Sequence, residues 1–539
     1  MLASALGVVI VSVVCGLLML IMTISMLVSM SSTGDTTMVR QNTVLTVDLG
    51  QIGGDREGSA LQALGDNSSV GLIDLVDAIR SAADDSKIVA LLIKNDGLSN
   101  VSWASFEELR GAVDGFRAAG KPVVSYAAIY SSGSYYLCSA AERVCLHPSG
   151  MVDFRGIGAE VMYYKDLLDK LGVEMQLIRP ESCSYKSAGE VYTMNHMSEA
   201  NREQIRAYIG SVWNTAVADM AKSRNMSVEQ LNRVADDLSG LLADDACANG
   251  LVDTLCFEED VRQMLKEQYG GKHLMGVEKY VKNRKAVKSK DKKMESSIAV
   301  IYAEGTVEDG SAKGFDNGVY GDEIVKALRQ AMNDDKVKAI VLRVNSPGGQ
   351  ATASESMTHA VMQAKEKKPV IVSMGDLAAS AGYEMSCMAD VIVAQPMTIT
   401  GSIGVFGTIP NVQKLMRQKL GVSTDTVSTN RNANGLSVYR PLSPAAMKLM
   451  ERNVEDFYKV FVGRVAEGRH MTYDAVHQIA RGRVWTGADA VKIGLVDTLG
   501  GLELALKIAA EKAGLEQYAV KEYPAEKDLM TQLAELLGE

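Results

Sequence analysis

The segments ADDSKIVALLIKND, at residues 83–96, and NDDKVKAIVLRVNS, at residues 333–346, resemble each other and decide the fold of this chain. A second pair of similar segments follows in the same order: GKPVVSYAA at 120–128 and KKPVIVSMG at 367–375. Both pairs are separated by about 250 residues, and such an offset indicates a duplicated unit rather than a short-period solenoid.

The duplication continues toward the end of each unit. The six residues GLVDTL occur at 250–255 and again at 494–499. Each unit is therefore about 200 residues long, enough to bury a core of its own. The full length of 539 residues fits two such domains with flanking segments.

Within the second unit, short β-rich runs alternate with helical patterns. Residues 298–303, 339–344 and 369–374 are apolar runs typical of buried strands, whereas 321–332 and 354–364 have helical periodicity. This alternation predicts an α/β fold with largely parallel strands that are covered on both faces.

The N-terminal segment differs from the rest. Residues 2–34 contain no charged side chain, and the apolar stretch 2–30 is longer than the about 20 residues that cross a bilayer. A cleaved signal peptide is the alternative, but its apolar core would be about 7–15 residues long and preceded by basic residues. We therefore expect a transmembrane anchor.

Residues 279–293 hold eight basic side chains and one acidic one, which indicates a linker between the units, with contact to an anionic lipid surface as a weaker alternative. The expected organisation is an anchor at 1–34, a first repeat at 42–270, a basic linker at 271–296 and a second repeat at 297–525.

Composition excludes some functions. Charged residues make up 23% of the chain, and the formal charge of −10 disfavours a dedicated nucleic-acid binder, which needs a basic surface. The seven cysteines are an odd number without a CxxC pair, so neither a zinc site nor a complete disulfide framework is indicated.

Two glycines follow a predicted strand of the second unit. The strand AIVLRV runs into Asn345-Ser346-Pro347-Gly348-Gly349. Without a Cβ, the backbone of Gly348 and Gly349 can turn its N–H groups toward a ligand, which would stabilise a developing oxyanion. Most such junctions are simple turns, so the motif alone does not establish a site.

A serine lies among small residues after the next predicted strand. Ser380 is in the segment GDLAASAGY at 375–383, where small neighbours would let a substrate carbonyl approach Oγ; a helix cap is the structural alternative. No histidine occurs between 360 and 469, so the usual base is missing nearby. A lysine can replace it when burial lowers its pKa. Lys186, in SCSYKSAG at 182–189, is a candidate, although such a lysine is more often solvated.

Taken together, these motifs resemble those of the signal peptide peptidase A family, also called protease IV, in its long form with two tandem repeats. The resemblance covers nearly the whole chain. It rests on YKSA around Lys186, NSPGG at 345–349, AASAGY at 378–383, TGSIGVFG at 400–407 and RVWTGADAVKIGLVDTLG at 483–500.

The resemblance implies a role for each site residue. Ser380 would be the nucleophile and Lys186 the general base, with Ser402 orienting the lysine amine. The N–H groups of Gly348 and Gly349 would form the oxyanion hole. The chain departs from the family pattern at Ala381 and Ser184, where the family often has glycine, and we expect only local adjustment because both side chains are small.

The resemblance also implies the remaining properties. It predicts two tandem crotonase/Clp-protease-like repeats and a Ser/Lys endopeptidase that degrades hydrophobic remnants of signal peptides through an acyl-enzyme. The enzyme would be a homotetramer with a single anchor in the inner (cytoplasmic) membrane and its catalytic part outside the cytoplasm, and it would need no metal or other cofactor. The alternatives are a crotonase-type acyl-CoA hydratase or hydrolase and a non-catalytic membrane scaffold.

The repeat also predicts one site per chain. At the offset of 247 between the two Lys-Pro-Val segments, Ser380 corresponds to Gly133. Lys186 corresponds to residues 432–435, Asn-Ala-Asn-Gly, which contain no lysine. The first repeat would therefore supply only the base and the second only the nucleophile.

Overall fold

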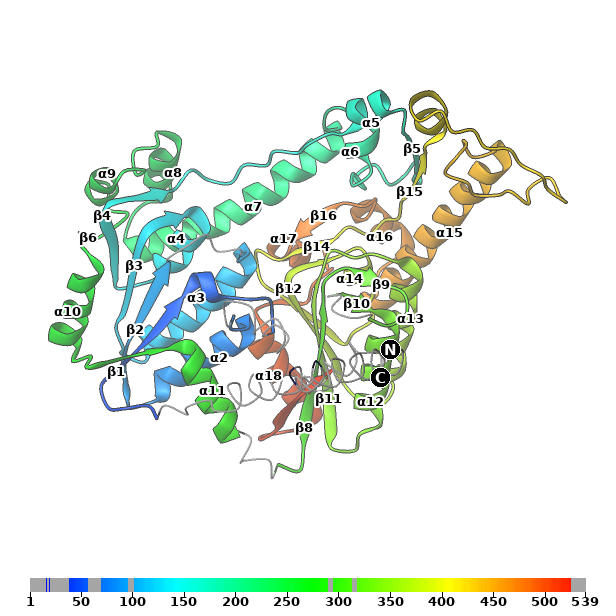
Figure 1. The fold of residues 1–539 in the computed structure, drawn as a ribbon. Helices are drawn as coiled ribbons and strands as arrows, with labels where there is room; N and C mark the ends of the chain where they lie inside the picture. Colours follow the sequence, from blue (N-terminus) through cyan, green and yellow to red (C-terminus); the bar gives the residue numbers. More distant parts are fainter. Residues whose placement is uncertain are drawn as a thin grey trace, which may run out of the picture.

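The computed structural model contains two α/β domains side by side (Figure 1). It describes residues 38–56, 69–95, 101–288, 294–312 and 318–524, together with Gly16 and Met19. Within these ranges no helix has the length and apolarity needed to cross a membrane. Apart from those two residues, the predicted anchor at 1–34 lies outside the described part of the chain.

The first domain is built on a six-stranded sheet in the order β6-β4-β3-β2-β1-β7. Every neighbouring pair in it is parallel, as the continuous apolar runs predict. Its strands are β1 (Thr43–Asp48), β2 (Ile88–Asn95), β3 (Val123–Ser131), β4 (Arg143–Asp153), β6 (Thr254–Leu255) and β7 (His273–Gly276).

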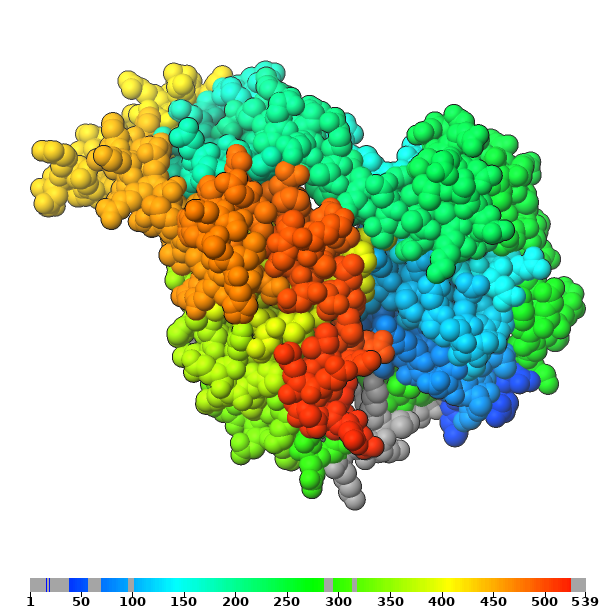
Figure 2. Space-filling model, turned by 180° about the vertical axis from the view of Figure 1, so that it is seen from behind, coloured from blue at the N-terminus to red at the C-terminus, as the bar shows by residue number. Residues whose placement is uncertain are grey.

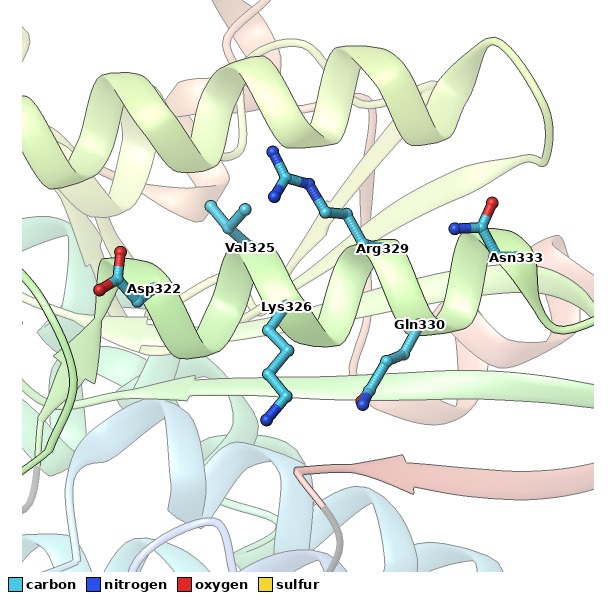
Figure 3. A pocket seen from close by; sticks show the side chains of 6 residues that line it. All are labelled: Asp322, Val325, Lys326, Arg329, Gln330 and Asn333. Atoms are coloured by element: carbon cyan, nitrogen blue, oxygen red, sulfur yellow. The ribbon is translucent and has the colours of Figure 1, made fainter.

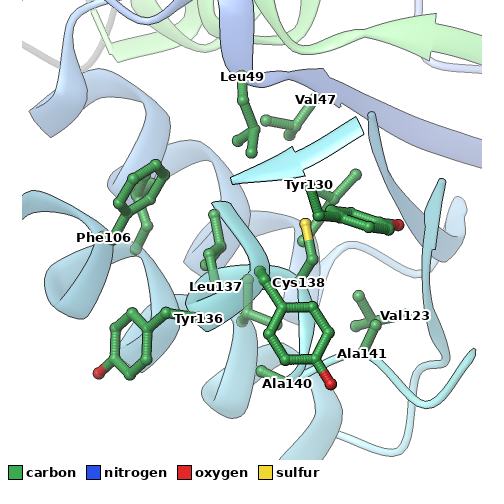
Figure 4. Close-up of a cluster of buried hydrophobic side chains, with 14 of the residues drawn as sticks. Val47, Leu49, Phe106, Val123, Tyr130, Tyr136, Leu137, Cys138, Ala140 and Ala141 are labelled. Carbon is green, nitrogen blue, oxygen red and sulfur yellow. The ribbon is translucent and has the colours of Figure 1, made fainter. Parts of the chain in front are cut away.

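Helices cover both faces of this sheet (Figure 1). The helices of the first domain are the 3-10 turn η1 (Leu49–Gln51), α2 (Leu72–Asp84), α3 (Trp103–Ala118), α4 (Ser132–Cys138), α5 (Lys165–Leu171), α6 (Glu190–Thr193), α7 (Glu199–Arg224), α8 (Val228–Asp236), α9 (Ala243–Ala248), α10 (Glu258–Tyr269) and α11 (Val277–Lys288). Of these, α5 and α6 lie away from the sheet, near β5 (Glu174–Ile178) (Figure 1). Figure 4 shows Phe106 of α3, Leu137 of α4 and Tyr130 of β3, which belong to one buried core cluster. Each buried side chain of this size contributes about 1.5–3 kcal/mol.

The second domain repeats the plan with an eight-stranded sheet. Its main path is β16-β14-β12-β11-β8-β18, and β13 pairs with β12 and β17 beside that path. All pairs are parallel except β14 with β16. The strands are β8 (Ser297–Glu304), β11 (Val337–Ser346), β12 (Val370–Ala379), β13 (Val391–Ala394), β14 (Ile399–Gly401), β16 (Val484–Thr486), β17 (Thr498–Leu499) and β18 (Ala519–Tyr523).

The helices of the second domain include both that the sequence predicts. They are α12 (Gly321–Asn333), α13 (Ala351–Lys365), α14 (Ala381–Glu384), a π-helical turn (Leu415–Lys419), α15 (Pro444–Gly468), α16 (Tyr473–Ile479), α17 (Gly487–Lys492) and α18 (Leu502–Ala513). A small parallel pair, β9 (Val307–Glu308) with β10 (Val319–Tyr320), lies beside α12. The predicted α/β class with parallel sheets is thus confirmed.

The predicted linker at 271–296 is wrong in its first part. Strand β7 continues the first sheet beside β1, and α11 buries Tyr280 and Val281. Its basic residues face acidic ones of α2: Lys285 pairs with Asp74 at 2.8 Å. A basic run that forms ion pairs on a neighbouring helix is part of the domain, which sequence composition does not reveal. The strand β18 occupies the matching place beside β8 in the second sheet.

One short two-stranded sheet contains a strand from each domain. Strand β5 (Glu174–Ile178) of the first domain pairs antiparallel with β15 (Gly407–Asn411) of the second, at the end of the molecule where α5 and α15 also lie (Figure 1). The long helix α7 runs from that end back to the first sheet, and its Ser211 hydroxyl lies 2.8 Å from that of Thr486 in β16.

Buried charges also join the two domains. Arg343 of β11 donates to both carboxylate oxygens of Asp55 at 2.9 Å and to Glu108 of α3 at 3.0 Å. All three side chains are at most 2% exposed. Ser105 of α3 donates to Asp376 of β12 through its backbone N–H and its hydroxyl. On the side seen in Figure 2 the two domains touch along the middle of their boundary. Because β11 and β12 lead into the predicted site loops, this interface fixes those loops against the first domain.

Candidate active site

Ser380 lies where β12 ends and the short helix α14 begins. Its backbone has φ 56° and ψ −121°, a conformation that side-chain-bearing residues rarely adopt and that occurs at functional sites. The backbone N–H of Ser380 donates to Gly401 O at 2.9 Å, and its carbonyl accepts from the N–H of Tyr383 and Glu384. The turn therefore holds the half-buried Ser380 side chain in one place.

Lys186 comes from the first domain, in the loop between β5 and α6, and reaches across the interface. Its Nζ lies 3.0 Å from Ser380 Oγ. The side chain is 6% exposed, and burial lowers the pKa of Lys186 to about 8, against the opposing effects of the Cys183 thiol and the Glu384 carboxyl. A substantial fraction of neutral amine is thus present in mildly alkaline solution.

Ser402 contacts the same amine twice. Lys186 Nζ donates to the Ser402 carbonyl at 2.9 Å and lies at the same distance, 2.9 Å, from the Ser402 hydroxyl. Ser402 follows β14 with φ 50°, and its N–H donates to Arg483 O at 2.7 Å. The structure thus brings Ser380, Lys186 and Ser402 together, and the two serine oxygens and one carbonyl surround the amine.

Gly348 and Gly349 lie beside the serine. A Cβ on Gly348, which has φ 101°, would come within 2.6 Å of Ser380 Cβ, and one on Gly349 within 2.1 Å of Val307 O. Both positions therefore require glycine. The N–H of Gly348 donates to Ser346 Oγ at 3.1 Å, while that of Gly349 has no acceptor among the described residues.

The sequence did not single out the backbone N–H of Ala381 as a possible oxyanion donor. It directly follows the nucleophile candidate and, like that of Gly349, has no acceptor in the described ranges. The ideal Cβ position of Gly348 is 2.9 Å from this nitrogen, so the two loops are in contact. In the sequence, the one indication of this donor is that Ala381 directly follows Ser380, because the residue after a nucleophile can present its backbone N–H to the oxyanion.

A buried carboxyl lies one turn along α14. Glu384 is 7% exposed and accepts from Ser354 Oγ at 2.6 Å. Burial raises the pKa of Glu384 to about 7. Near neutral pH this group is therefore partly protonated and only partly offsets the charge of Lys186.

Among the described residues, no three His, Cys, Asp or Glu side chains lie close enough together to hold a metal ion. A hollow of about 520 Å³ on α12 is lined by Asp322, Val325, Lys326, Arg329, Gln330 and Asn333 (Figure 3). Its lining residues all belong to one helix and include none of the predicted site residues. This hollow is therefore not the site described above.

Comparison with known proteins identifies relatives over most of the chain. A family model described as peptidase family S49 matches residues 115–272 and 362–516. Protease 4 of Salmonella typhi is 38% identical over 89% of this chain and 78% of its own, and protease 4 of Haemophilus influenzae is 35% identical over 85% and 75%. A putative signal peptide peptidase SppA of Enterococcus faecium is 35% identical over 42% of this chain and 66% of its own.

These likenesses define the chain as a serine peptidase of the protease 4 type. It belongs to peptidase family S49. A mutant ClpP1 from Listeria monocytogenes matches at 14% identity with a TM-score of 0.26, over 38% of this chain and 94% of that one, too weak a likeness to carry an argument. The crotonase/Clp-protease-like character of the repeats stays a prediction.

Proposed function

We propose that this chain is a membrane-anchored endopeptidase that cleaves hydrophobic remnants of signal peptides with a Ser380/Lys186 dyad. The observation that carries the proposal is the 3.0 Å separation of Lys186 Nζ and Ser380 Oγ, with the lysine buried and its pKa lowered to about 8. A buried neutral amine beside a serine hydroxyl is what a serine nucleophile without histidine requires.

The proposed reaction has two halves. Ser380 Oγ attacks the peptide carbonyl while the neutral Lys186 amine takes the hydroxyl proton. The tetrahedral oxyanion is stabilised by backbone N–H groups of Gly348, Gly349 and Ala381. The resulting ammonium then gives its proton to the leaving amine, the C–N bond breaks and an acyl ester remains on Ser380.

In the second half, water attacks the ester, Lys186 accepts a water proton, and that proton passes to Ser380 Oγ as the acid product leaves. For Gly348 to contribute, its N–H must break its hydrogen bond to Ser346 Oγ and donate to the oxyanion instead. Ser402 would hold the amine between these transfers, because it contacts Nζ through both its carbonyl and its hydroxyl.

A fluorophosphonate probe tests the reaction class. We expect it to label Ser380 in the full-length protein and to fail on Ser380→Ala. A crotonase-type acyl-CoA hydratase or hydrolase, or a non-catalytic scaffold, would leave Ser380 unlabelled. Labelling that persists in Ser380→Ala would contradict the assignment of the nucleophile.

The substrate class rests on the resemblance of the motifs and on the similarity to the signal peptide peptidase SppA of Enterococcus faecium. Physical chemistry agrees with it, because charged side chains near the site would hydrate Lys186 and raise its pKa. We expect apolar peptides rich in Leu and Ala to be cleaved faster than charged peptides of equal length. Equal turnover of the two would refute the apolar preference without affecting the dyad.

For the assembly we propose a homotetramer in which segments 423–427 and 159–163 of neighbouring copies pair. The motif KLGV before β5, at 170–173, recurs at 419–422, so 423–427 is the counterpart of β5. By the repeat offset, 159–163 is the counterpart of β15. Neither segment has a strand partner within the described chain.

Exposed apolar side chains support this contact. Val427 is 97% exposed, and Leu420 and Leu436 more than 60%. The segment 420–436 to which they belong is yellow to gold in Figure 2, the colours of the projecting part of the second domain. Sedimentation should give a tetramer for the wild type and smaller species for Val427→Asp. A monomeric wild type would overturn the proposed assembly.

For the location we propose the inner (cytoplasmic) membrane, with the catalytic part outside the cytoplasm. The support is the uncharged stretch 2–34 and the resemblance of the motifs. Protease added to intact spheroplasts should degrade the catalytic part. Protection until the membrane is broken would place it on the other side.

A further inference from the structure

The segment Arg481–Arg483 lies between the two parts of the site that hold the lysine amine. On one side, Gly482 N–H donates to Ile403 O at 2.8 Å, and Arg483 O accepts from Ser402 N–H. On the other side, Arg481 O accepts from the N–H of Tyr185 at 3.0 Å. The segment thus joins the Ser402 strand end to the Lys186 loop.

The side chain of Arg481 adds to this connection. Its Nε donates to Ser182 O at 3.2 Å and its Nη2 to Ser184 Oγ at 2.9 Å. Its guanidinium also lies 5.6 Å from the ring centre of Tyr185. The loop just before Lys186 is therefore held from the second domain by several bonds.

Gly482 makes the closest contact in this arrangement. It has φ 81°, and an added Cβ would lie 2.5 Å from Cβ, 2.6 Å from N and 2.7 Å from Cα of Lys186. Those atoms are mostly backbone and cannot swing aside as the end of a flexible side chain can. On its other side, the Gly482 Cα lies 2.8 Å from the ideal Cβ position of Gly404.

Arg481 has φ 57°, a left-handed conformation that is strained for a residue with a side chain. Such a conformation persists only where the surroundings hold it, and this strain concentrates at functional sites. The backbone is thus bent so that the Cα of Gly482 faces the backbone of Lys186.

We propose that Gly482 is a positioning residue for the base, because its lack of a side chain lets segment 481–483 press on the Lys186 backbone and set the distance from Nζ to Ser380 Oγ. This inference rests on the proposed Ser380/Lys186 dyad. A methyl group at residue 482 pushes the lysine backbone away, and Nζ then loses its place between Ser380 and Ser402. Misplacement of a catalytic group by about 1 Å can cost about 10²-fold in rate.

The chain supplies a matched control. Gly494 has nearly the same conformation, φ 80°, but an added Cβ there would meet only Met471 Sδ at 3.8 Å. Gly482→Ala and Gly494→Ala therefore both place a side chain at a positive φ of nearly the same size, and only the first displaces Lys186. Both variants are made in the full-length protein, and kcat, KM, the pH profile and the thermal midpoint are measured.

We expect Gly482→Ala to lower kcat about 10²-fold with little change in KM, and to slow fluorophosphonate labelling of Ser380 in proportion. The rise of kcat with pH should also move upward, because a displaced amine is less buried, while Cys183 and Glu384 remain its titratable neighbours. Gly494→Ala should lose thermal stability and keep wild-type kcat and pH profile.

Folded Gly482→Ala with kcat within about threefold of wild type overturns the inference, as does an equal loss of kcat in both glycine variants. If Gly482→Ala does not fold, Arg481→Met decides: it removes the bonds to Ser182 and Ser184, and an unchanged kcat and pH profile then refutes the positioning role. Fluorophosphonate labelling of Ser380 in the wild-type protein is measured first. If the wild type is not labelled, the proposed dyad is wrong. If the wild type is labelled and Gly482→Ala has unchanged activity, only the positioning role of Gly482 is wrong.

Discussion

Ser132 occupies in the first domain the position that Ser380 occupies in the second. Each serine directly follows a strand, β3 or β12, and three residues later a buried tyrosine donates to the matching leucine carbonyl: Tyr135 to Leu251 at 2.7 Å and Tyr383 to Leu495 at 2.8 Å. The offset here is 248, so the predicted counterpart, Gly133, is wrong by one residue. Strand β12 has ten residues and β3 nine, which the offset of 247 at the strand starts did not reveal.

Ser132 is nonetheless expected to be inert. Its hydroxyl donates to Asp153 O at 2.7 Å, and the place of Ser402 is taken by Phe154, which packs on Tyr135. A tight acylating inhibitor should therefore titrate to one equivalent per chain. Mass spectrometry should find all of it on Ser380, with Ser132→Ala labelled like the wild type. A second equivalent, or any label on Ser132, would show that the first domain also reacts.

Removal of either member of the dyad should abolish turnover. Ser380→Ala and Lys186→Ala are each expected to lower kcat by about 10²–10⁴-fold or more, and the double variant no further, because the two groups act in one proton transfer. Lys165→Ala is the control, since that lysine is exposed and its ion-pair partner among the described residues is Asp169 alone. Additive losses in the double variant would mean that the two residues act separately.

Activity should rise with pH. The base must be neutral, so kcat is expected to increase as pH passes through the Lys186 pKa of about 8 and to level off above it. Lys186→Arg should be inactive throughout, because a guanidinium stays protonated. The profile is measured with an uncharged peptide. A maximum near pH 6 would indicate a histidine or carboxylate base instead.

Ser402→Ala should reduce kcat without abolishing it. The variant removes the hydroxyl contact to Lys186 Nζ but keeps the carbonyl of residue 402 as a partner. One lost hydrogen bond of about 1 kcal/mol corresponds to a reduction of roughly tenfold at most. Steady-state kinetics against Ser402→Thr, which retains a hydroxyl, checks this. A loss as large as that of Lys186→Ala would give Ser402 a direct chemical role.

Arg343→Met should destabilise the docking of the two domains. It leaves Asp55 and Glu108 buried without their cation, a change that costs about 3–5 kcal/mol. The control is Glu503→Gln, which breaks the exposed pair with Arg80 across the same two domains and should cost at most about 1 kcal/mol. Urea unfolding followed by intrinsic fluorescence compares the two. If Arg343→Met and Glu503→Gln unfold at the same urea concentration, the buried cluster does not hold the domains together.

Much of this architecture could be predicted because it depends on local patterns. The apolar runs of the second unit became β8, β11 and β12, and the helical patterns became α12 and α13. Ser380, Lys186 and Ser402 could be named from their motifs, and the structure places the Lys186 amine within 3.0 Å of both serine hydroxyls.

Other features depend on tertiary contacts that sequence patterns do not encode. The basic run near Lys285 belongs to the first domain because α2 presents Asp74 to it. The Gly348 N–H donates to Ser346 Oγ, and Gly482 lies against the backbone of Lys186. Both contacts form only after the loops have folded. A one-residue difference in strand length likewise becomes visible only through matching hydrogen bonds.

The division of the site between the domains has a consequence for biosynthesis. A ribosome makes Lys186 first, then Ser380, and only near the end of the chain Arg481–Arg483, which connects the two. Domains fold in this order as they emerge. A nascent chain that ends before residues 481–483 therefore lacks the segment that joins the Lys186 loop to the Ser402 strand end, and the complete site can form only when the second domain is nearly finished.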